Sequence, residues 1–181
     1  GVEHIPVHHT NEIAQSEAAN GVKFVNYWLH NEHLLVDNKK MAKSAGTNFS
    51  LAEIKAKGFS PLTLRYFFLQ AHYRSKQNFT WQALGAAKNG LSHLMNQTKG
   101  LGHKKGKVDK NYKEKFAEAL TDDFNTPRAL AVVQEMLKSN LLVKDKLATI
   151  LNFDSVLGLN LAGVFNQENI PADIKKLVED R

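Results

Sequence analysis

The sequence predicts a mainly α-helical protein whose carboxyl-terminal third is an antiparallel helical bundle. Apolar residues between Leu130 and Leu141 recur at helical spacing and form one continuous stripe. Pairs typical of helix starts, Ser60-Pro61 and Thr126-Pro127, precede such periodic stretches. Residues that favour β-structure are concentrated in residues 22–37, where they predict two short strands.

The elements are expected in a simple order. Good helix formers in residues 8–19 precede Gly21, where a C-cap glycine belongs. The two strands are expected in "VKFVNYWLH" and "HLLVD". The capping-box pattern of Ser50 and Glu53 predicts a short helix that Gly58 closes. Further helices are expected from 60 to about 73–74, from 80 to about 96, from 112 to 120 and from 126 onward. Between them, "TKGLGHKKGKVDKN" breaks the periodicity and predicts a subdomain boundary.

Composition excludes several classes of protein. With 181 residues and 43% hydrophobic content, the chain is too apolar to be disordered and can bury a core. It lacks an apolar run near the ~20 residues of a membrane helix and shows no export leader, so we expect a cytoplasmic protein without a membrane partner. The absence of cysteine excludes disulfides and thiolate metal ligands within the chain. The net charge of +6 is compatible with a nucleic-acid or phosphate partner.

The stretch "DNKKMAKSAGT" (37–47) fits neither a helical stripe nor an alternating strand. Its lysines, Lys39, Lys40 and Lys43, and the hydroxyl of Ser44 are donors suited to phosphate. Chemistry alone leaves a solvated basic turn as the alternative. A second candidate site is the pair His8 and Glu12, whose spacing of four lets both side chains reach one metal ion. An ordinary exposed helix pair is the alternative there.

Five motifs carry a resemblance to a known family. In chain order they are "VHHTNEIAQSEAA" (7–19), "NYWLH" (26–30), "KMAKS" (40–44), "LRYFFLQAHYRS" (64–75) and "DDFNTPRAL" (122–130). Together they resemble the second half of a cysteinyl-tRNA synthetase, a class I ligase. The resemblance implies the end of a Rossmann-type α/β catalytic domain in residues 1–58, a helical stem-contact segment in 59–100 and an anticodon-binding-type helical bundle in 101–181.

The chain also departs from the family pattern. The family's amino half, with its histidine-containing ATP signature and two zinc-binding cysteines, has no counterpart here, and the chain stops at "LVEDR". We interpret it as a fragment or a split piece of the enzyme and expect it to be inactive alone. A separate chain that carries the amino half is a further partner to look for.

The resemblance gives the two candidate sites specific roles. It implies one Zn²⁺ ion held by His8, Glu12 and the two cysteines of the missing half, and this ion binds the substrate's thiolate. His9 is expected to pack or hydrogen-bond nearby. The lysine loop matches the family's K-M-S-K-S signature with Ala42 in place of serine. It implies ATP binding, with Mg²⁺, by Lys40, Met41 and Lys43, with Met41 expected to anchor the loop in an apolar pocket rather than to touch ATP. It also implies catalysis by Lys40, Lys43 and Ser44, which stabilise the leaving pyrophosphate.

Contacts to tRNA are implied for Arg65, Tyr73 and Arg74, where the inner bend of the tRNA would pass. Each has a structural alternative, because Tyr73 can be core and Arg65 can pair with a helix carboxylate. The linker lysines of residues 99–107 add salt-sensitive affinity or keep the segment soluble. The "DDFNTP" motif is interpreted as structural, with Asp123, Asn125 and Thr126 as capping groups.

Two classes of function remain open from the sequence. The first is part of a cysteine–tRNA ligase, which uses ATP and L-cysteine, charges tRNA(Cys) and releases AMP and pyrophosphate. The second is a stand-alone RNA-binding helical module or a related ATP-dependent cysteine ligase that acts on a small amine. The intact lysine loop favours the enzyme, and the helical bundle favours tRNA over a small amine.

Overall fold

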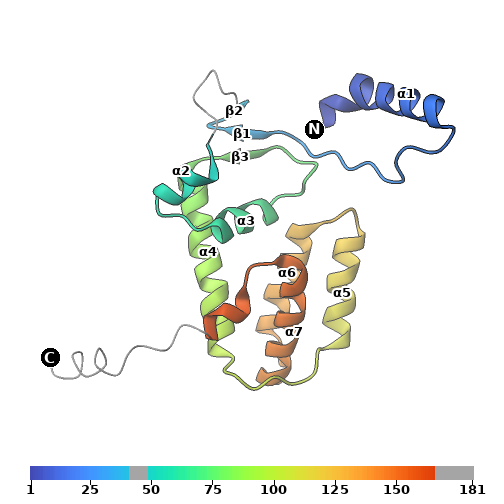
Figure 1. Cartoon of the computed structure of the whole chain (residues 1–181). Coiled ribbons are helices and arrows are strands. Elements are labelled where there is room, and N and C mark those ends of the chain that lie inside the picture. The colour runs from blue at the N-terminus through green and yellow to red at the C-terminus, as the bar shows by residue number, and fades with distance from the viewer. Residues whose placement is uncertain (41–48, 166–181) are drawn as a thin grey trace.

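The computed structural model of the chain describes residues 1–40, with the main chain only for Lys40, and residues 49–165. Figure 1 shows an amino-terminal helical arm, a small sheet flanked by helices, and a bundle. The arm comprises η1 (Val2–His4), a π-helical turn η2 (Ile5–His9) and α1 (Thr10–Asn20). The middle comprises β1 (Leu34–Val36), β2 (Lys39–Lys40), α2 (Leu51–Ala56), α3 (Pro61–Leu69), β3 (Gln77–Phe79) and α4 (Trp81–Gly100). The bundle comprises α5 (Lys110–Thr121), α6 (Thr126–Lys138), α7 (Val143–Leu157) and η4 (Leu161–Phe165).

The prediction of a mainly helical chain is confirmed, and so are the predicted starts of α2, α3 and α6. Ser50 and Glu53 form a complete capping box at α2. Ser60 caps α3 by accepting from the amide of Thr63, and Pro61 is its first residue. The predicted C-cap is also found. Gly21 ends α1 with φ of 66°, a left-handed conformation that glycine adopts without steric cost.

The sheet is small and mixed, with strand order β2-β1-β3. β1 pairs antiparallel with β2, with Val36 opposite Lys39, and parallel with β3, with Val36 opposite Phe79. Both central residues of the β1–β2 turn, Asp37 and Asn38, have positive φ. This is the backbone that two-residue hairpins require, and Asp and Asn tolerate it better than most residues.

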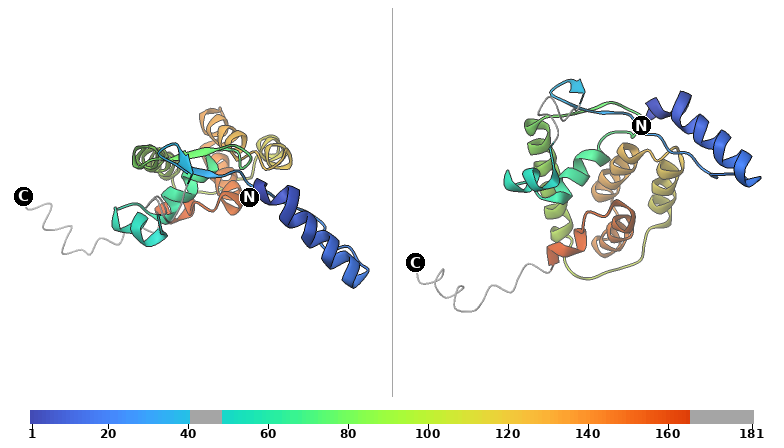
Figure 2. Two further views of the ribbon diagram at one scale, coloured as in Figure 1. Left: turned by 90° about the horizontal axis from the view of Figure 1, so that it is seen from above. Right: turned by 45° about the horizontal axis from the view of Figure 1, so that its top comes forward.

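One predicted strand is wrong. Residues 22–33 are extended or bent chain and form no strand, whereas the second predicted strand is found as β1. The side chains of Phe24, Tyr27 and Leu29 are exposed, Tyr27 by 92%. A strand needs a hydrogen-bonding neighbour, and none of the described residues supplies one here. Figure 2 shows α1 and this stretch projecting away from the rest of the molecule.

Three helix ends and one helix start also differ from the prediction. α3 ends at Leu69 rather than near Tyr73 and Arg74, because the chain turns there toward other elements. α6 ends at Lys138, so Leu141 lies beyond the helix that its stripe predicted. α4 continues four residues past the expected end, to Gly100, and α5 begins at Lys110, where Asp109 accepts from the amide of Tyr112.

The bundle and the middle helices share one buried core. Phe116 of α5 stacks on Phe153 of α7 with ring centroids 4.1 Å apart. Leu84 and Leu94 of α4 and Met136 of α6 are fully buried in the same cluster. Because burial of such side chains is the main stabilising contribution to folding, this core fixes the middle helices against the bundle. Within residues 1–40 and 49–165, no helix is long and apolar enough to cross a membrane.

Candidate functional site

The β1–β2 hairpin leads directly into the lysine motif. The amide of Asp37 donates to the carbonyl of Phe79 at 3.1 Å, and the amide of Asn38 donates to the side-chain oxygen of Asn78 at 2.8 Å. The turn is therefore fixed to β3 at both of its central residues. Lys40 lies in β2, and Met41, Lys43 and Ser44 lie outside the described residues. The strand predicted in "HLLVD" precedes the stretch 37–47 as β1, and the helix predicted by the capping box follows it as α2, whereas Lys39 and Lys40, which fitted no strand pattern, form β2.

The predicted metal ligands lie on the amino-terminal arm. His8 is in η2 and exposed, and Glu12 is in the first turn of α1 and half-buried. Neither side chain has a hydrogen bond or an ion pair within the described part of the chain, so both keep their ligand atoms available. An imidazole nitrogen and a carboxylate oxygen are ordinary zinc ligands, and two of them fit half of a four-ligand site. No group of three or more potential ligands occurs among the described residues.

A cluster of aromatic side chains packs around His8. His9 Nδ1 lies 2.7 Å from His30 Nε2, and the His9 ring packs on Trp28 at 4.6 Å. The prediction that His9 packs or hydrogen-bonds nearby is confirmed. Desolvation, and then the proximity of His30, lower the pKa of His9. Sequence reasoning missed Trp28 and His30, although both lie in the "NYWLH" motif.

The predicted tRNA contacts Tyr73 and Arg74 meet Asp123 of the α5–α6 connection. The Tyr73 hydroxyl donates to Asp123 Oδ1 at 2.5 Å, and Arg74 Nε lies 2.7 Å from Asp123 Oδ2. Arg74 Nε also donates to the Tyr73 hydroxyl at 2.9 Å. These bonds lower the pKa of Asp123, with the one from Tyr73 contributing most, and they raise the pKa of Arg74. Asp123 is therefore not the capping group that the sequence predicted, a role that Asn125 takes alone.

The third predicted tRNA contact, Arg65, reaches the carboxyl end of α7. Its Nε donates to the carbonyl of Leu157 at 2.5 Å and its Nη2 to the carbonyl of Val156 at 3.3 Å. A cation at this position complements the helix dipole and satisfies terminal carbonyls. Arg65 thus has a structural role. The sequence allows a helix carboxylate as its structural partner, whereas the structure shows helix carbonyls instead.

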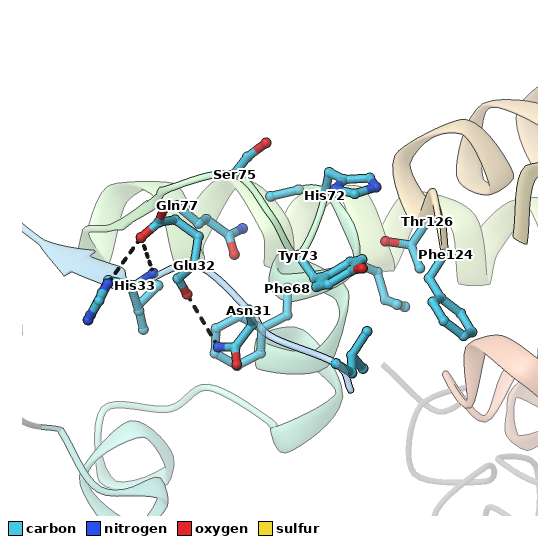
Figure 3. A pocket seen from close by; sticks show the side chains of 14 residues that line it. Asn31, Glu32, His33, Phe68, His72, Tyr73, Ser75, Gln77, Phe124 and Thr126 are labelled. Atoms are coloured by element: carbon cyan, nitrogen blue, oxygen red, sulfur yellow. Dashed lines mark hydrogen bonds and ion pairs between the residues drawn. The ribbon is translucent and has the colours of Figure 1, made fainter. Parts of the chain in front are cut away.

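A pocket of about 460 Å³ lies between the extended chain, the end of α3 and the α5–α6 connection. In Figure 3 the side chains of Phe68, Tyr73 and Phe124 line it, and Glu32 bonds to His33 at its edge. The volume is in the range of small-ligand sites. Its polar groups at Glu32 and Tyr73 already have partners, which leaves mainly apolar walls.

Comparison with known proteins shows the family to which the chain belongs. The profile of the class I (C) tRNA synthetase catalytic domain matches residues 1–89, and the DALR-domain profile matches residues 115–162. The cysteine–tRNA ligase of Treponema denticola is 40% identical over all of this chain and 44% of its own length. The chain belongs to the cysteinyl-tRNA synthetase family.

Other cysteinyl-tRNA synthetase relatives agree. The cysteine–tRNA ligase 1 of Burkholderia lata is 44% identical over 89% of this chain and 34% of its own length. The cysteine–tRNA ligase of Halorhodospira halophila is 47% identical over 70% of this chain and 27% of its own length. The chain thus spans less than half the length of these cysteinyl-tRNA synthetases. The zinc, ATP and tRNA roles of its individual residues stay predictions.

Proposed function

We propose that the chain forms part of a cysteine–tRNA ligase, which activates cysteine with ATP and transfers it to tRNA(Cys). The observation that carries this proposal is the lysine motif, residues 40–44, which begins at the last residue of a hairpin that is hydrogen-bonded to β3. All of this chain matches a cysteine–tRNA ligase. A basic loop anchored on rigid elements can hold cationic donors toward a phosphate group as charge develops on it.

In this proposal Lys40 and Lys43 bind the triphosphate of ATP, which enters with Mg²⁺, and stabilise the pyrophosphate as it leaves. Ser44 adds a neutral hydrogen-bond donor, and Met41 anchors the loop by apolar packing. Ala42 lacks the hydroxyl of the signature serine but changes no charge. The cationic donors act most strongly in the transition state, because charge on the leaving group increases there.

The proposed zinc half-site uses His8 and Glu12, whose side chains have no other polar partner in the described residues. Two further ligands come from outside this chain. A bound zinc ion supplies a soft Lewis acid that prefers a thiolate to a hydroxyl. His9 hydrogen-bonds to His30 and packs on both His8 and Trp28 beside the proposed half-site.

For tRNA, we propose Arg74 as a contact, because 63% of its side chain is exposed. Arg65 and Tyr73 stay in the proposal, and like Arg74, which binds Tyr73 and Asp123, each already donates to a partner within the chain. The exposed apolar side chains of residues 22–29 are proposed to pack against the rest of a Rossmann-type catalytic domain.

A chimera tests the proposal. This chain would replace the matching segment of the Treponema denticola enzyme, and cysteine-dependent ATP–pyrophosphate exchange and tRNA(Cys) charging would be measured. We expect both activities. Exchange without charging, together with transfer of cysteine to a small amine, would instead favour the small-amine ligase. A folded chimera that binds tRNA but shows no exchange would favour the RNA-binding module.

A further inference from the structure

The carboxylate of Asp123 connects two parts of the molecule that are far apart in the sequence. It lies in the short connection between α5 and α6, and its partners Tyr73 and Arg74 lie in the turn that follows α3. His72 Nε2 faces the same carboxylate at 3.8 Å. The Tyr73 ring also meets Phe124 edge-on, with centroids 6.4 Å apart. The bundle therefore contacts this turn through both polar and aromatic groups.

The backbone presents Asp123 in an uncommon conformation. Asp123 and Phe124 both have φ of 53°, in the left-handed region that most residues avoid. The amide of Phe124 donates to the carbonyl of Leu120, and the amide of Asn125 donates to the carbonyl of Ala119. These bonds hold the backbone of the connection between the two helices, so the position of Asp123 relative to the turn after α3 is set by the bundle.

The turn after α3 also contacts the chain that leads into β1. The carbonyl of Tyr73 accepts from the amide of Glu32 at 2.8 Å, two residues before β1. From there β3 pairs along all of β1, and Asn78 and Phe79 bind the hairpin turn. Residues 72–79 thus contact the hairpin along β1 and at its turn. Asp123 binds the first residues of this segment, Tyr73 and Arg74. Figure 3 shows Tyr73 between Asn31 and Phe124.

We infer that Asp123 is a positioning residue through which the helical bundle sets the position of the β1–β2 hairpin. The bonds form a continuous route from the Asp123 carboxylate to Tyr73, then to Glu32 and β1. The relevance of the hairpin to catalysis rests on the proposed function of the lysine motif. The structural coupling itself does not, because it concerns only contacts between described residues.

Hydrogen exchange in the full chain tests this inference. Asp123→Asn removes the charge but keeps a residue that tolerates positive φ, so the backbone conformation stays accessible. We expect the Glu32 amide to exchange about two- to fivefold faster in this variant, the scale for an exposed ion pair. The amide of Ile150, buried in α7, should be accelerated less than that of Glu32, because it reports only the loss of global stability and not the local coupling.

Asp122→Asn is the matched control. It removes the same charge one residue earlier, but Asp122 faces Arg128 at 3.2 Å rather than the turn. Its Glu32 amide should exchange like that of the wild type. Tyr73→Phe removes the other bond to Asp123 and should reproduce the effect of Asp123→Asn, even if the latter folds poorly. Equal Glu32 exchange in wild type, Asp123→Asn and Tyr73→Phe would overturn the inference, as would equal acceleration at Ile150. Neither result depends on ligase activity, so a failure here is distinct from a failure of the proposed function.

Discussion

The guanidinium of Arg65 closes the carboxyl end of α7 by donating from Nε to the carbonyl of Leu157 at 2.5 Å. The two residues are 92 positions apart, and their bond joins α3 to the bundle. Gly158 follows with φ of 63°, and a Cβ there would lie 3.0 Å from the Arg65 guanidinium. A residue that resembles a tRNA contact in sequence is thus part of the packing between helices.

The first prediction concerns this bond. Arg65→Ala should lower the free energy of unfolding by about 1 kcal/mol, since it removes a charged donor from terminal helix carbonyls. Arg65→Lys should recover part of the loss, because it keeps the charge without the planar fork. Urea denaturation of both variants measures the effect. Unchanged stability in Arg65→Ala, combined with weaker tRNA binding, would show that the tRNA contact is its main role.

A second prediction concerns pH. The folded-state pKa of Asp123 is lowered below the ordinary 3.8 by Tyr73, Arg74 and, more weakly, His72. A lowered carboxyl pKa contributes stability that is fully present above the unfolded-state value and is lost as pH falls through the folded-state value. The stability difference between wild type and Asp123→Asn should therefore be constant near neutral pH and decline below the ordinary aspartate pKa. Denaturation at a series of acidic pH values measures it. A difference that grows on acidification would contradict this sign.

The third prediction concerns zinc. The isolated chain offers His8 and Glu12 and should lose zinc on dialysis against a mild chelator, because two ligands bind the ion weakly. The chimera with the Treponema denticola enzyme should retain it, and His8→Ala or Glu12→Gln in the chimera should reduce the zinc content. His4→Ala is the control, since the His4 ring lies beside His8 with centroids 5.3 Å apart. Stoichiometric zinc in the dialysed isolated chain would mean that His4 or His9 completes a different site.

The fourth prediction concerns activity of the chain alone. The purified 181-residue chain should show no cysteine-dependent ATP–pyrophosphate exchange, because groups from the rest of the catalytic domain are needed for both substrates. The exchange assay needs only the chain, ATP, labelled pyrophosphate and cysteine. Exchange that depends on added cysteine would contradict the interpretation of the chain as part of the enzyme.

Local signals predicted the local structure well. The caps at Ser50, Ser60 and Gly21 act within a few residues, so the sequence contains everything that determines them. The framing of the lysine motif by a strand and a helix follows from the same short-range rules. For the stretch 22–30 these rules were insufficient, because a strand also needs a neighbour that the described residues do not provide.

Long-range partners could not be predicted. Tyr73 and Asp123 are 50 positions apart, and no periodicity relates them. The early end of α3 has the same origin, because the bonds of Tyr73 to Glu32 and Asp123 favour a turn where the apolar stripe alone favours a helix. The motifs that carry the family resemblance contain most of these residues. Resemblance therefore indicated where the important side chains are, but not which of them contact one another.

The fifth prediction concerns Lys43 in the chimeric enzyme, with cysteine activation and transfer to tRNA measured separately by single-turnover kinetics. Lys43→Ala should slow activation by roughly 10²–10³, the scale of losing one preorganised donor, while ATP affinity changes much less. Transfer from preformed adenylate should be nearly unchanged, because pyrophosphate has already left.

Two variants control for charge and for the altered signature. Lys55→Ala removes the same charge from an exposed side chain of α2 and should have little effect on activation. Ala42→Ser restores a donor and should be close to neutral. The decisive comparison is the activation step against the transfer step in Lys43→Ala. A loss confined to activation is the result we predict, and an equal loss in both steps, or a loss entirely in ATP binding, would contradict the proposed action of the lysine motif on the leaving pyrophosphate.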